Sequence, residues 1–512
     1  MKNINRQNAF IQRLHIRKIS ALTDFNLPAR SSVLFTAINV FSKGAAFVFT
    51  PIFTRLLTEA EYGEYSLFNT ILSVTVVLGS LELSGGVIMR AHQKERSTES
   101  LTTLIAMTLS WAVTAAVFGG FLAVKRVTGG GMSFPFSNTL LLLATLGTNT
   151  VNLFLSGARF KYKWLPSLLS SVASSVIAPI LGIALIRAGI SDGYRITAKL
   201  FASVMITVIL SFVFIFITLK RAKAEISKEL FTFDSVLNAI KQKIRLLLRL
   251  SLPLLPYYIS IALISSIDKI TVGEAFGKEA LALYSVAYSA GIALSSVFSG
   301  VSHALCPWIM RKTRAGKQDA VRQTLGNIFL LFAGVCAAFM LLSPEVLSLL
   351  APSSYNEALP VLLITAISPI PVCAAACSSS IAIAEEKVGG VLLAGVIPLS
   401  LSLLYLTLAA SRLGILFAAI SVPAAYTLSA LIECASAKRI TGSRPFSPWL
   451  LSGITLALAL FGSIVFRLKN LFPLRLVILC SIILFILYML YRLLPLILEK
   501  RTSATADNQS EN

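Results

Sequence analysis

Charged residues are scarce in this sequence. Only 13% of its 512 residues are Asp, Glu, Lys or Arg, and the acidic ones number just 23. Soluble globular domains carry about 25% charged residues. Because 56% of the residues are hydrophobic and the mean hydropathy is +0.80, a soluble fold is excluded and a multi-span membrane protein is expected.

Signatures of catalysis are missing as well. The chain has no Gly-x4-Gly-Lys-Ser/Thr phosphate loop, and its three histidines are scattered and form no zinc motif. The predicted outer loops are no longer than about 15 residues, an ordinary connector length, so a catalytic loop domain has no room. We therefore expect no enzyme, no ATP hydrolysis and no cofactor.

Cysteine offers no disulfide framework and no metal site. All six cysteines lie in or beside apolar runs, where disulfides have little use. Cys373 and Cys377 share one helix face, but a metal ion would need further ligands nearby. Small apolar filler is the favoured interpretation for both, and no metal site is predicted.

Long apolar runs recur along nearly the whole chain. A run of roughly 20 residues crosses about 30 Å of hydrocarbon as a helix, and continuous runs of this kind exclude the short alternating segments of a β-barrel. We count fourteen predicted spans. They cover residues 33–54, 65–89, 100–124, 138–157, 165–187, 196–219, 250–272, 281–308, 325–343, 357–383, 388–410, 413–436, 448–466 and 471–495.

Basic residues follow the predicted topology. With the N-terminus in the cytoplasm, 32 Lys and Arg fall on the inner side and 12 on the outer side. This bias marks cytoplasmic loops, so we expect an inner (cytoplasmic) membrane protein with both termini inside. Anionic lipids account for the net charge of +22 without a nucleic acid partner. Residues 219–250 are either an amphipathic helix on the inner leaflet or a simple linker.

An internal repeat organises the spans. "EYSLFNTI" (64–71) and "LYSVAYSA" (283–290) each open a span after an acidic loop, and both spans end in "IMR" (88–90 and 309–311). The offsets are 219 from Tyr65 to Tyr284 and 221 from Met89 to Met310. Because each copy has an even number of spans, the two copies run in the same direction through the membrane.

The expected fold is an all-α polytopic membrane protein of about fourteen helices. Two parallel six-helix lobes surround a central cavity, and two extra helices follow them. The predicted parts are a cytoplasmic N-terminal segment (1–30), an N-lobe (31–219), a cytoplasmic linker (220–249), a C-lobe (250–437), two further spans (445–496) and a disordered cytoplasmic tail (497–512).

The segment 250–309 resembles spans seven and eight of the polysaccharide transporters, the Wzx-type flippases of the superfamily that also holds MATE exporters and lipid II flippases. It has a Pro-rich entry, an Asp followed by a basic residue in "SSIDK", an acidic loop, "YSVAY" and a late "PW", and "TRLLTEAEYGEYSLF" (54–68) resembles the family's first outer loop. The resemblance implies flipping of an undecaprenyl-pyrophosphate-linked oligosaccharide to the outer leaflet by alternating access. Polymerase and chain-length proteins of such a pathway are expected partners.

Ionisable residues inside spans are the first site candidates. Lys43 and Glu82 are predicted at roughly 15 Å and 10 Å depth. Lys43 either contacts the diphosphate from a cavity or pairs with Glu82 to lock two helices. Glu82 is also a candidate for coupling to H+ or Na+, and the choice of ion stays open.

Asp268 and Lys269 form the second candidate group. Adjacent helix residues face different neighbours, so they are not each other's partners. We expect Asp268 to clamp a gate between the lobes and Lys269 to face the cavity mouth, unless both only snorkel to water. Arg55, Arg90 and Arg311 are the other basic candidates for the substrate cavity. Arg90 and Arg311 are equally well explained as anchors at the inner membrane boundary.

Two other functions stay open. A drug or organic cation antiporter would need unpaired acids in its cavity, and a membrane scaffold for glycan assembly would tolerate neutralisation of Lys43 and Glu82. A lipid II flippase would use the same chemistry as the polysaccharide transporter. Span number, the sign of the cavity charge and the "IDK…YSVAY" segment favour the polysaccharide transporter.

Overall fold

The computed structural model describes residues 27–84, 91, 98–127, 138–188, 195–229, 233–385, 389–410 and 414–507. Within these ranges the chain is built from helices and short turns, and no strand occurs. A helix satisfies its backbone hydrogen bonds internally, which the hydrocarbon of a membrane requires. The predicted all-α class is confirmed.

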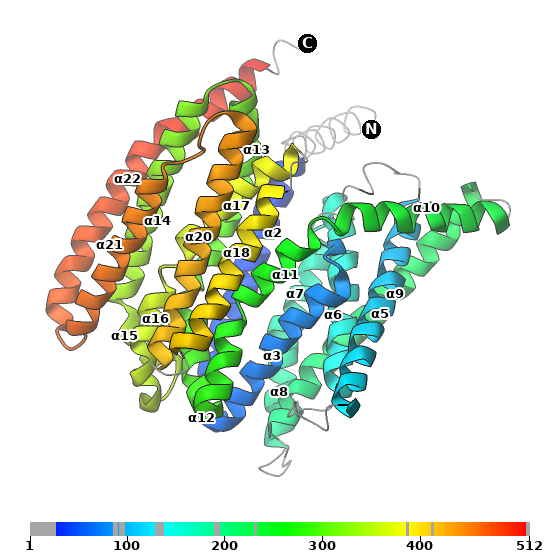
Figure 1. The fold of residues 1–512 in the computed structure, drawn as a ribbon, viewed down its shortest axis with the longest axis horizontal. Helices are drawn as coiled ribbons and strands as arrows, with labels where there is room; N and C mark the ends of the chain where they lie inside the picture. The colour runs from blue at the N-terminus through cyan, green and yellow to red at the C-terminus, as the bar shows by residue number, and fades with distance from the viewer. Residues whose placement is uncertain are drawn as a thin grey trace, which may run out of the picture.

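The first bundle contains the first six predicted spans. Within it, α9 packs against α5, α6 and α8 (Figure 1). The helices in chain order are α2 (Leu27–Leu56), α3 (Glu59–Ser80), α5 (Glu99–Val127), α6 (Asn138–Phe160), the run of α7 (Leu165–Val172), η2 (Ala173–Ile177) and α8 (Ala178–Arg187), and α9 (Arg195–Glu229).

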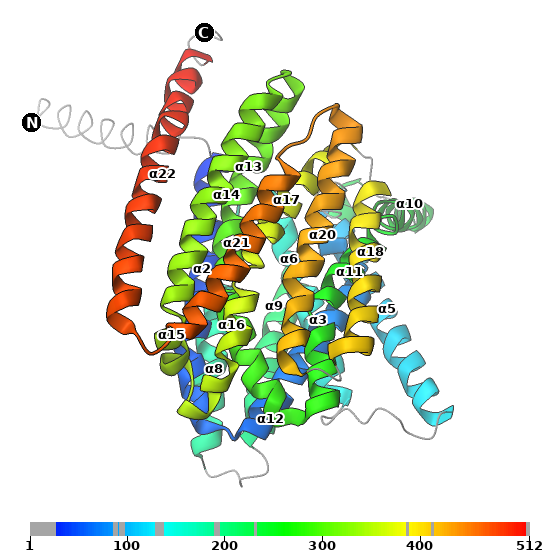
Figure 2. The same ribbon diagram turned by 60° about the vertical axis from the view of Figure 1, so that its left-hand side comes forward.

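The second bundle contains the next six predicted spans, and α20 packs there against α17 and α18. Two more helices, α21 (Pro448–Arg467) and α22 (Phe472–Asp507), pack against α14 at the edge of this bundle (Figure 2). The bundle itself comprises α11 (Leu255–Ile264), α12 (Ile267–Gly291), α13 (Leu294–Arg314), α14 (Gln318–Leu341), α15 (Ser343–Leu350), η4 (Ser353–Ala358), α16 (Leu359–Thr365), α17 (Pro369–Ala384), α18 (Gly389–Tyr405), η5 (Leu406–Ala410) and α20 (Ile415–Thr441).

Helix α10 (Phe233–Ser251) connects the bundles and runs across the axis of the first one (Figure 1). Lys243 Nζ donates to Thr98 Oγ1 at 2.6 Å, and Leu247 is fully buried. Lys241, Arg245 and Arg249 are exposed on another face of the same helix. The connection is thus an amphipathic helix fixed to α5.

Twelve helical segments of the described chain are long and apolar enough to cross a membrane. One of them, Leu255–Ser302, has 48 residues, which at 1.5 Å per residue is about 72 Å and enough for two crossings. Gly277 interrupts it with a φ of +87°, which glycine adopts without steric cost. The apolar α3 is not among the twelve, and the count of fourteen spans stays a prediction.

Several predicted spans are broken in the structure: α12 and α13 separate within 281–308 and α16 and α17 within 357–383, and two further breaks lie close to predicted site residues. Helix α3 ends at Ser80, within the span predicted over 65–89, and Leu81 and Glu82 take left-handed conformations with φ of +49° and +53°. Ser110 Oγ donates to the Gly79 carbonyl at 3.0 Å, and the Glu82 N–H donates to Ser80 Oγ at 3.1 Å. Side-chain hydroxyls therefore replace backbone partners at this break.

The second break separates α11 from α12 at Ser265 and Ser266. Ser266 lies at the N-cap position of α12, so Asp268 falls in the first helical turn. A carboxylate in that position is stabilised by the free N–H groups of the helix start. The acid in the apolar run thus lies at a helix N-terminus, which hydropathy alone does not reveal.

Candidate functional site

The two bundles meet through residues that we call the joint. One hydrophobic cluster continues across it, because Phe53, Leu57 and Tyr62 of the first bundle are buried with Tyr284 of the second. Helices α3 and α12 form the main contact (Figure 1). The joint comprises Thr54, Arg55, Gly63, Glu64, Ser66 and Ser73 on the first bundle and Ser266, Lys278, Ser285 and Ser348–Leu350 on the second.

Close backbone approach defines the centre of the joint. A Cβ atom at Gly63 would overlap the carbonyl oxygen of Lys278, so only glycine fits there. The Lys278 ammonium forms an ion pair with Glu64, and Ser66 Oγ donates to Ser285 Oγ. Small side chains thus allow α3 and α12 to touch directly.

Arg55 belongs to this joint. Its Nη1 donates to the carbonyl of Leu349 at 3.3 Å, and the neighbouring Thr54 Oγ1 donates to that of Leu350 at 2.7 Å. These carbonyls lie at the C-terminus of α15, where a cation is favoured by the helix dipole. In the structure the Arg55 guanidinium contacts the C-terminus of α15, whereas the sequence indicates Arg55 as a candidate for the substrate cavity.

The same short helix also contacts α22. Arg475 is 4% exposed and donates to both carboxylate oxygens of Glu345, at 2.9 and 2.6 Å, and to the Leu341 carbonyl at 2.6 Å. Bidentate pairs of this kind are the strong ones. Helix α15 thus links α2 of the first bundle to α22.

Asp268 is fully buried, and Tyr284 Oη donates to its Oδ2 at 2.6 Å. Lys269 instead donates to the Ser265 carbonyl at 2.7 Å and lies 3.4 Å from the centre of the Tyr288 ring. The two neighbours have separate partners, as predicted. Ser266, two residues before Asp268, lies 3.1 Å from Ser73 of α3 through the hydroxyl oxygens, so the break in the helix contacts the first bundle directly.

Of the remaining predicted residues, the structure describes the side chains of Lys43 and Glu82 only. Lys43 is exposed on α2, and the described ion pairs do not include a pair with Glu82, which lies in the break after α3. Arg90 lies outside the described residues, and of Arg311 the structure describes only the helix α13 that carries it. The structure leaves the roles of these four residues as predictions.

Sequence reasoning missed several buried cations, and Lys199 is one of them. Lys199 of α9 is 4% exposed, and its Nζ lies 3.2 Å from the ring centre of Tyr65 and 3.7 Å from that of Phe53. Aromatic faces partly replace the lost hydration of such an ammonium group. Tyr65 marks the repeat, but nothing in the sequence around Lys199 indicates that the side chain turns inward.

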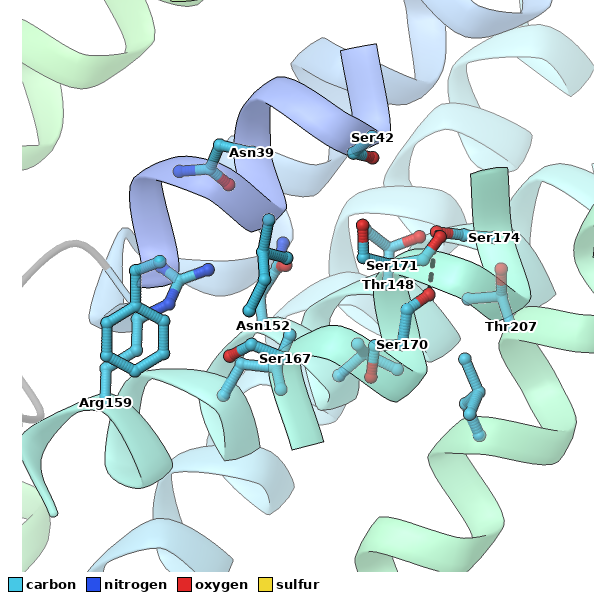
Figure 3. Close-up of a pocket in the computed structure, with 15 residues that line it drawn as sticks. Asn39, Ser42, Thr148, Asn152, Arg159, Ser167, Ser170, Ser171, Ser174 and Thr207 are labelled. Atoms are coloured by element: carbon cyan, nitrogen blue, oxygen red, sulfur yellow. Dashed lines mark hydrogen bonds between the residues drawn. The ribbon is translucent and has the colours of Figure 1, made fainter. Parts of the chain in front are cut away.

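A polar cavity of about 250 Å³ lies within the first bundle, between α2, α6, α7, η2 and α9 (Figure 3). The sequence placed the crevice between the bundles. Its lining is rich in hydroxyl and amide groups, and Arg159 is the one ionisable side chain among the described residues that line it. The lining residues are Phe35, Ile38, Asn39, Ser42, Thr148, Val151, Asn152, Leu155, Arg159, Ser167, Ser170, Ser171, Ser174, Thr207 and Leu210.

Serines at helical spacing form one wall. Ser167, Ser170, Ser171 and Ser174 recur every three or four residues, which puts them on one face of the helix. The face continues into η2, a π-helical turn of the kind that often marks functional sites. This periodic stripe is the sequence signal that could have located the cavity.

Several of these hydroxyls have no protein partner. Ser167 and Ser170 are each 5% exposed, and their Oγ atoms make no hydrogen bond to the described residues. Arg159 is exposed at the end of α6 and forms none of the described ion pairs (Figure 3). The hydroxyls of Ser167 and Ser170 are therefore enclosed in the protein, and Arg159 is the described cation of the lining that could contact an anion.

Solved membrane transporters share this architecture. The structure titled "Lipid II flippase MurJ, inward closed conformation" matches with a TM-score of 0.58 and 13% identity over 90% of this chain and 99% of that one. An outward-facing multidrug resistance MATE family transporter of the MOP superfamily matches with a TM-score of 0.56 and 12% identity, over 81% of this chain and 96% of that one. A MOP superfamily transporter from Pyrococcus furiosus with a binding pocket of reverse polarity matches with a TM-score of 0.54 and 13% identity, over 81% of this chain and 95% of that one.

These matches define the class: a multi-pass membrane protein with the fold of MOP superfamily transporters and flippases. The family profile described as "Polysaccharide biosynthesis protein" matches residues 29–312, more than half of the chain. The chain belongs to the polysaccharide biosynthesis protein family. No curated protein sequence matches it significantly.

Proposed function

We propose that this protein flips undecaprenyl-pyrophosphate-linked oligosaccharide units from the cytoplasmic to the outer leaflet of the inner membrane by alternating access. The observation that carries the proposal is the cavity of the first bundle, where hydroxyl and amide groups line the space and Arg159 is the one ionisable group among the described lining residues. Sugars are hydrogen-bonded by such groups, and a lipid diphosphate needs a cation. Family membership and fold support the same assignment.

The cavity argues against a cation antiporter. Such a transporter would bind its substrate with carboxylates, and the described part of the chain contributes no Asp or Glu to the lining of this cavity. The buried acids of the second bundle, Asp268 and Glu433, each accept a hydrogen bond from a tyrosine, at 2.6 and 2.9 Å. A lipid II flippase would present the same phosphate and sugar chemistry, and the family membership favours polysaccharide precursors over lipid II.

Opening and closing of the joint would let the protein alternate between a state open to the cytoplasm and a state open to the outside. It holds the bundles together at the end where α3 begins, and a substrate cannot leave there until the contacts of Ser66 and Lys278 part. In the proposed orientation, with both termini in the cytoplasm, this end faces outward. An H+ or Na+ gradient, or removal of product by a polymerase and chain-length proteins, would then drive net export.

The test is a deletion with complementation. Cells that lack the chain should accumulate undecaprenyl-linked repeat units on the cytoplasmic face, and the wild-type gene should restore export. Arg159→Gln should restore it poorly at equal membrane level, whereas Arg467→Gln, which removes a basic residue outside the cavity, should restore it fully. Unchanged lipid-linked glycan distribution after deletion would overturn the proposal.

A further inference from the structure

We infer that α22 keeps the joint closed, because Arg475 of α22 sets the position of α15 and α15 contacts α2. Arg475 is thus a positioning residue that acts on the joint through α15. The inference goes beyond the proposed function, since it concerns what holds the bundles together and not what they carry. It gives a role to the edge helix α22, which packs against α14 of the second bundle.

Helix α15 is short, and a different helix contacts each of its ends. It has eight residues, about 12 Å at 1.5 Å per residue, and lies at the end of the molecule where α22 begins (Figure 2). Pro344 lies in its first turn, and Pro352 follows its end. Because proline fits the first turn of a helix but cannot continue one, the sequence itself sets both ends of α15.

Arg475 fixes the corner between α14 and α15. Its guanidinium donates to the carbonyl of Leu341, the last residue of α14, and to both carboxylate oxygens of Glu345 in the first turn of α15. Leu347 and Leu350 also pack α15 into the core, but apolar contacts have no preferred direction. The planar guanidinium does have one, so the contacts of Arg475 fix the angle between the two helices.

The other end of α15 contacts α2. The last carbonyls of a helix have no partner within it, and in α15 those of Ser348, Leu349 and Leu350 accept hydrogen bonds from α2. Thr54 Oγ1 is the donor to Leu350, at 2.7 Å, and Arg55 donates to the other two, at 3.4 and 3.3 Å. Since α2 packs against α7 and η2 of the first bundle, these bonds join the two bundles.

A change at one end of α15 should therefore reach the other. Without the pair of Arg475 and Glu345, the angle between α14 and α15 is no longer fixed, and the carbonyl of Leu350 can move away from Thr54. A hydrogen bond weakens steeply once its geometry departs from the preferred one. The contacts between α2 and α15 should then break more often, and the joint should open more often.

The opening of the joint is measured by labelling a thiol inside it. Every chain is full length and carries Ser285→Cys together with Cys480→Ser, which removes the exposed native thiol. A membrane-impermeant maleimide is added outside whole cells, and the labelling rate is compared at equal levels of inserted protein. No lipid-linked glycan has to be supplied or identified for this readout.

Breaking the pair should speed the labelling. Glu345→Gln should raise the rate about fivefold or more, the lower end of the coupling typical between two sites. Arg475→Lys keeps the charge but loses the fork that contacts both oxygens, so its rate should be intermediate. The matched control is Glu99→Gln, which breaks the ion pair with Lys161 in the first bundle, outside the joint, and its rate should not change.

Thr54→Val tests the transmission through α15. Valine has nearly the size of threonine but cannot donate to the Leu350 carbonyl, so the labelling rate should again rise. In Glu345→Gln/Thr54→Val the rate should stay close to that of Thr54→Val alone, because the two changes break successive parts of one connection. Two independent sites would multiply their effects.

An unchanged rate in Glu345→Gln would overturn the inference, and so would an equal rise in Glu99→Gln or multiplied rates in the double variant. If Glu345→Gln does not insert, an unchanged rate in Arg475→Lys overturns it instead. The link from joint opening to export rests on the proposed function, but the labelling does not. A deletion that leaves the lipid-linked glycans unchanged would therefore overturn the proposed function and leave this inference standing.

Discussion

Ser66 of α3 and Ser285 of α12 hydrogen-bond to each other through their hydroxyls, and 219 residues separate them along the chain. The same offset separates Tyr65 from Tyr284, the first marker pair of the internal repeat. Equivalent residues of two parallel copies meet only where the axis relating the copies passes between them. We therefore infer that the axis of the predicted repeat passes between Ser66 and Ser285.

The first prediction concerns the closest contact of the joint. Gly63→Val should destabilise the joined state by about 1 to 3 kcal/mol, because its side chain would overlap the backbone of Lys278. Labelling of a cysteine at position 285 by a membrane-impermeant maleimide should rise accordingly. Gly44→Ala is the control, since nothing lies within 4 Å of a Cβ there. Equal labelling in both variants would contradict the prediction.

The second prediction concerns the buried acid at the broken helix. Asp268→Asn should reduce export without loss of inserted protein, and Tyr284→Phe should lower the free energy of unfolding by about 1 to 3 kcal/mol, because it leaves a buried carboxylate oxygen without its donor. A double-mutant cycle on the two positions measures their coupling. Additive effects, or full export in Asp268→Asn, would argue against a role for this pair.

The third prediction concerns the attachment of α22. Glu345→Gln should destabilise it by about 1 to 2 kcal/mol, because buried Arg475 loses its charged partner. Glu357→Gln, a change at an exposed acid nearby, should have little effect. Proteolysis between α21 and α22 and thermal unfolding measure the difference. Equal stability of the two variants would remove the structural role of the pair.

The same pair predicts a dependence on pH. Glu345 lies in α15, outside the candidate spans. Burial alone would raise the pKa of Glu345, but the hydrogen bonds from Arg475 outweigh it and hold the pKa below its ordinary value. The stabilisation is therefore complete above about pH 4.3 and is lost as the pH falls further through the lowered pKa. Thermal unfolding of wild type and Glu345→Gln should converge in that acidic range, and a constant difference would contradict the assignment.

Hydropathy and the repeat predict the fold because both depend on properties that a helical membrane protein must have. Long apolar runs must be helices in lipid, and the offset of 219 between the repeat markers equals the separation of Ser66 and Ser285, whose contact only the structure reveals. The breaks after Ser80 and at Ser265 do not follow in this way. Side-chain hydroxyls and a helix N-terminus compensate the lost backbone bonds there, and these compensations exist only in three dimensions.

The site was harder to predict than the fold. Sequence reasoning gave most weight to charges inside spans, such as Lys43, yet the cavity is lined mainly by uncharged groups. Arg159 lies in a predicted inner loop, where the positive-inside rule already explains a basic residue, so the sequence does not single it out. Lys199 and Arg475, predicted near outer loops, are buried by contacts from helices distant in the sequence.

The central claim is that the joint must open for the substrate to leave. Ser66→Cys/Ser285→Cys, made in a Cys480→Ser background that removes the exposed native thiol, places two thiols where the hydroxyls now touch. Oxidation should abolish export of lipid-linked glycan and reduction should restore it, while either single cysteine variant stays active. Export at the wild-type rate by the fully cross-linked protein would contradict the account.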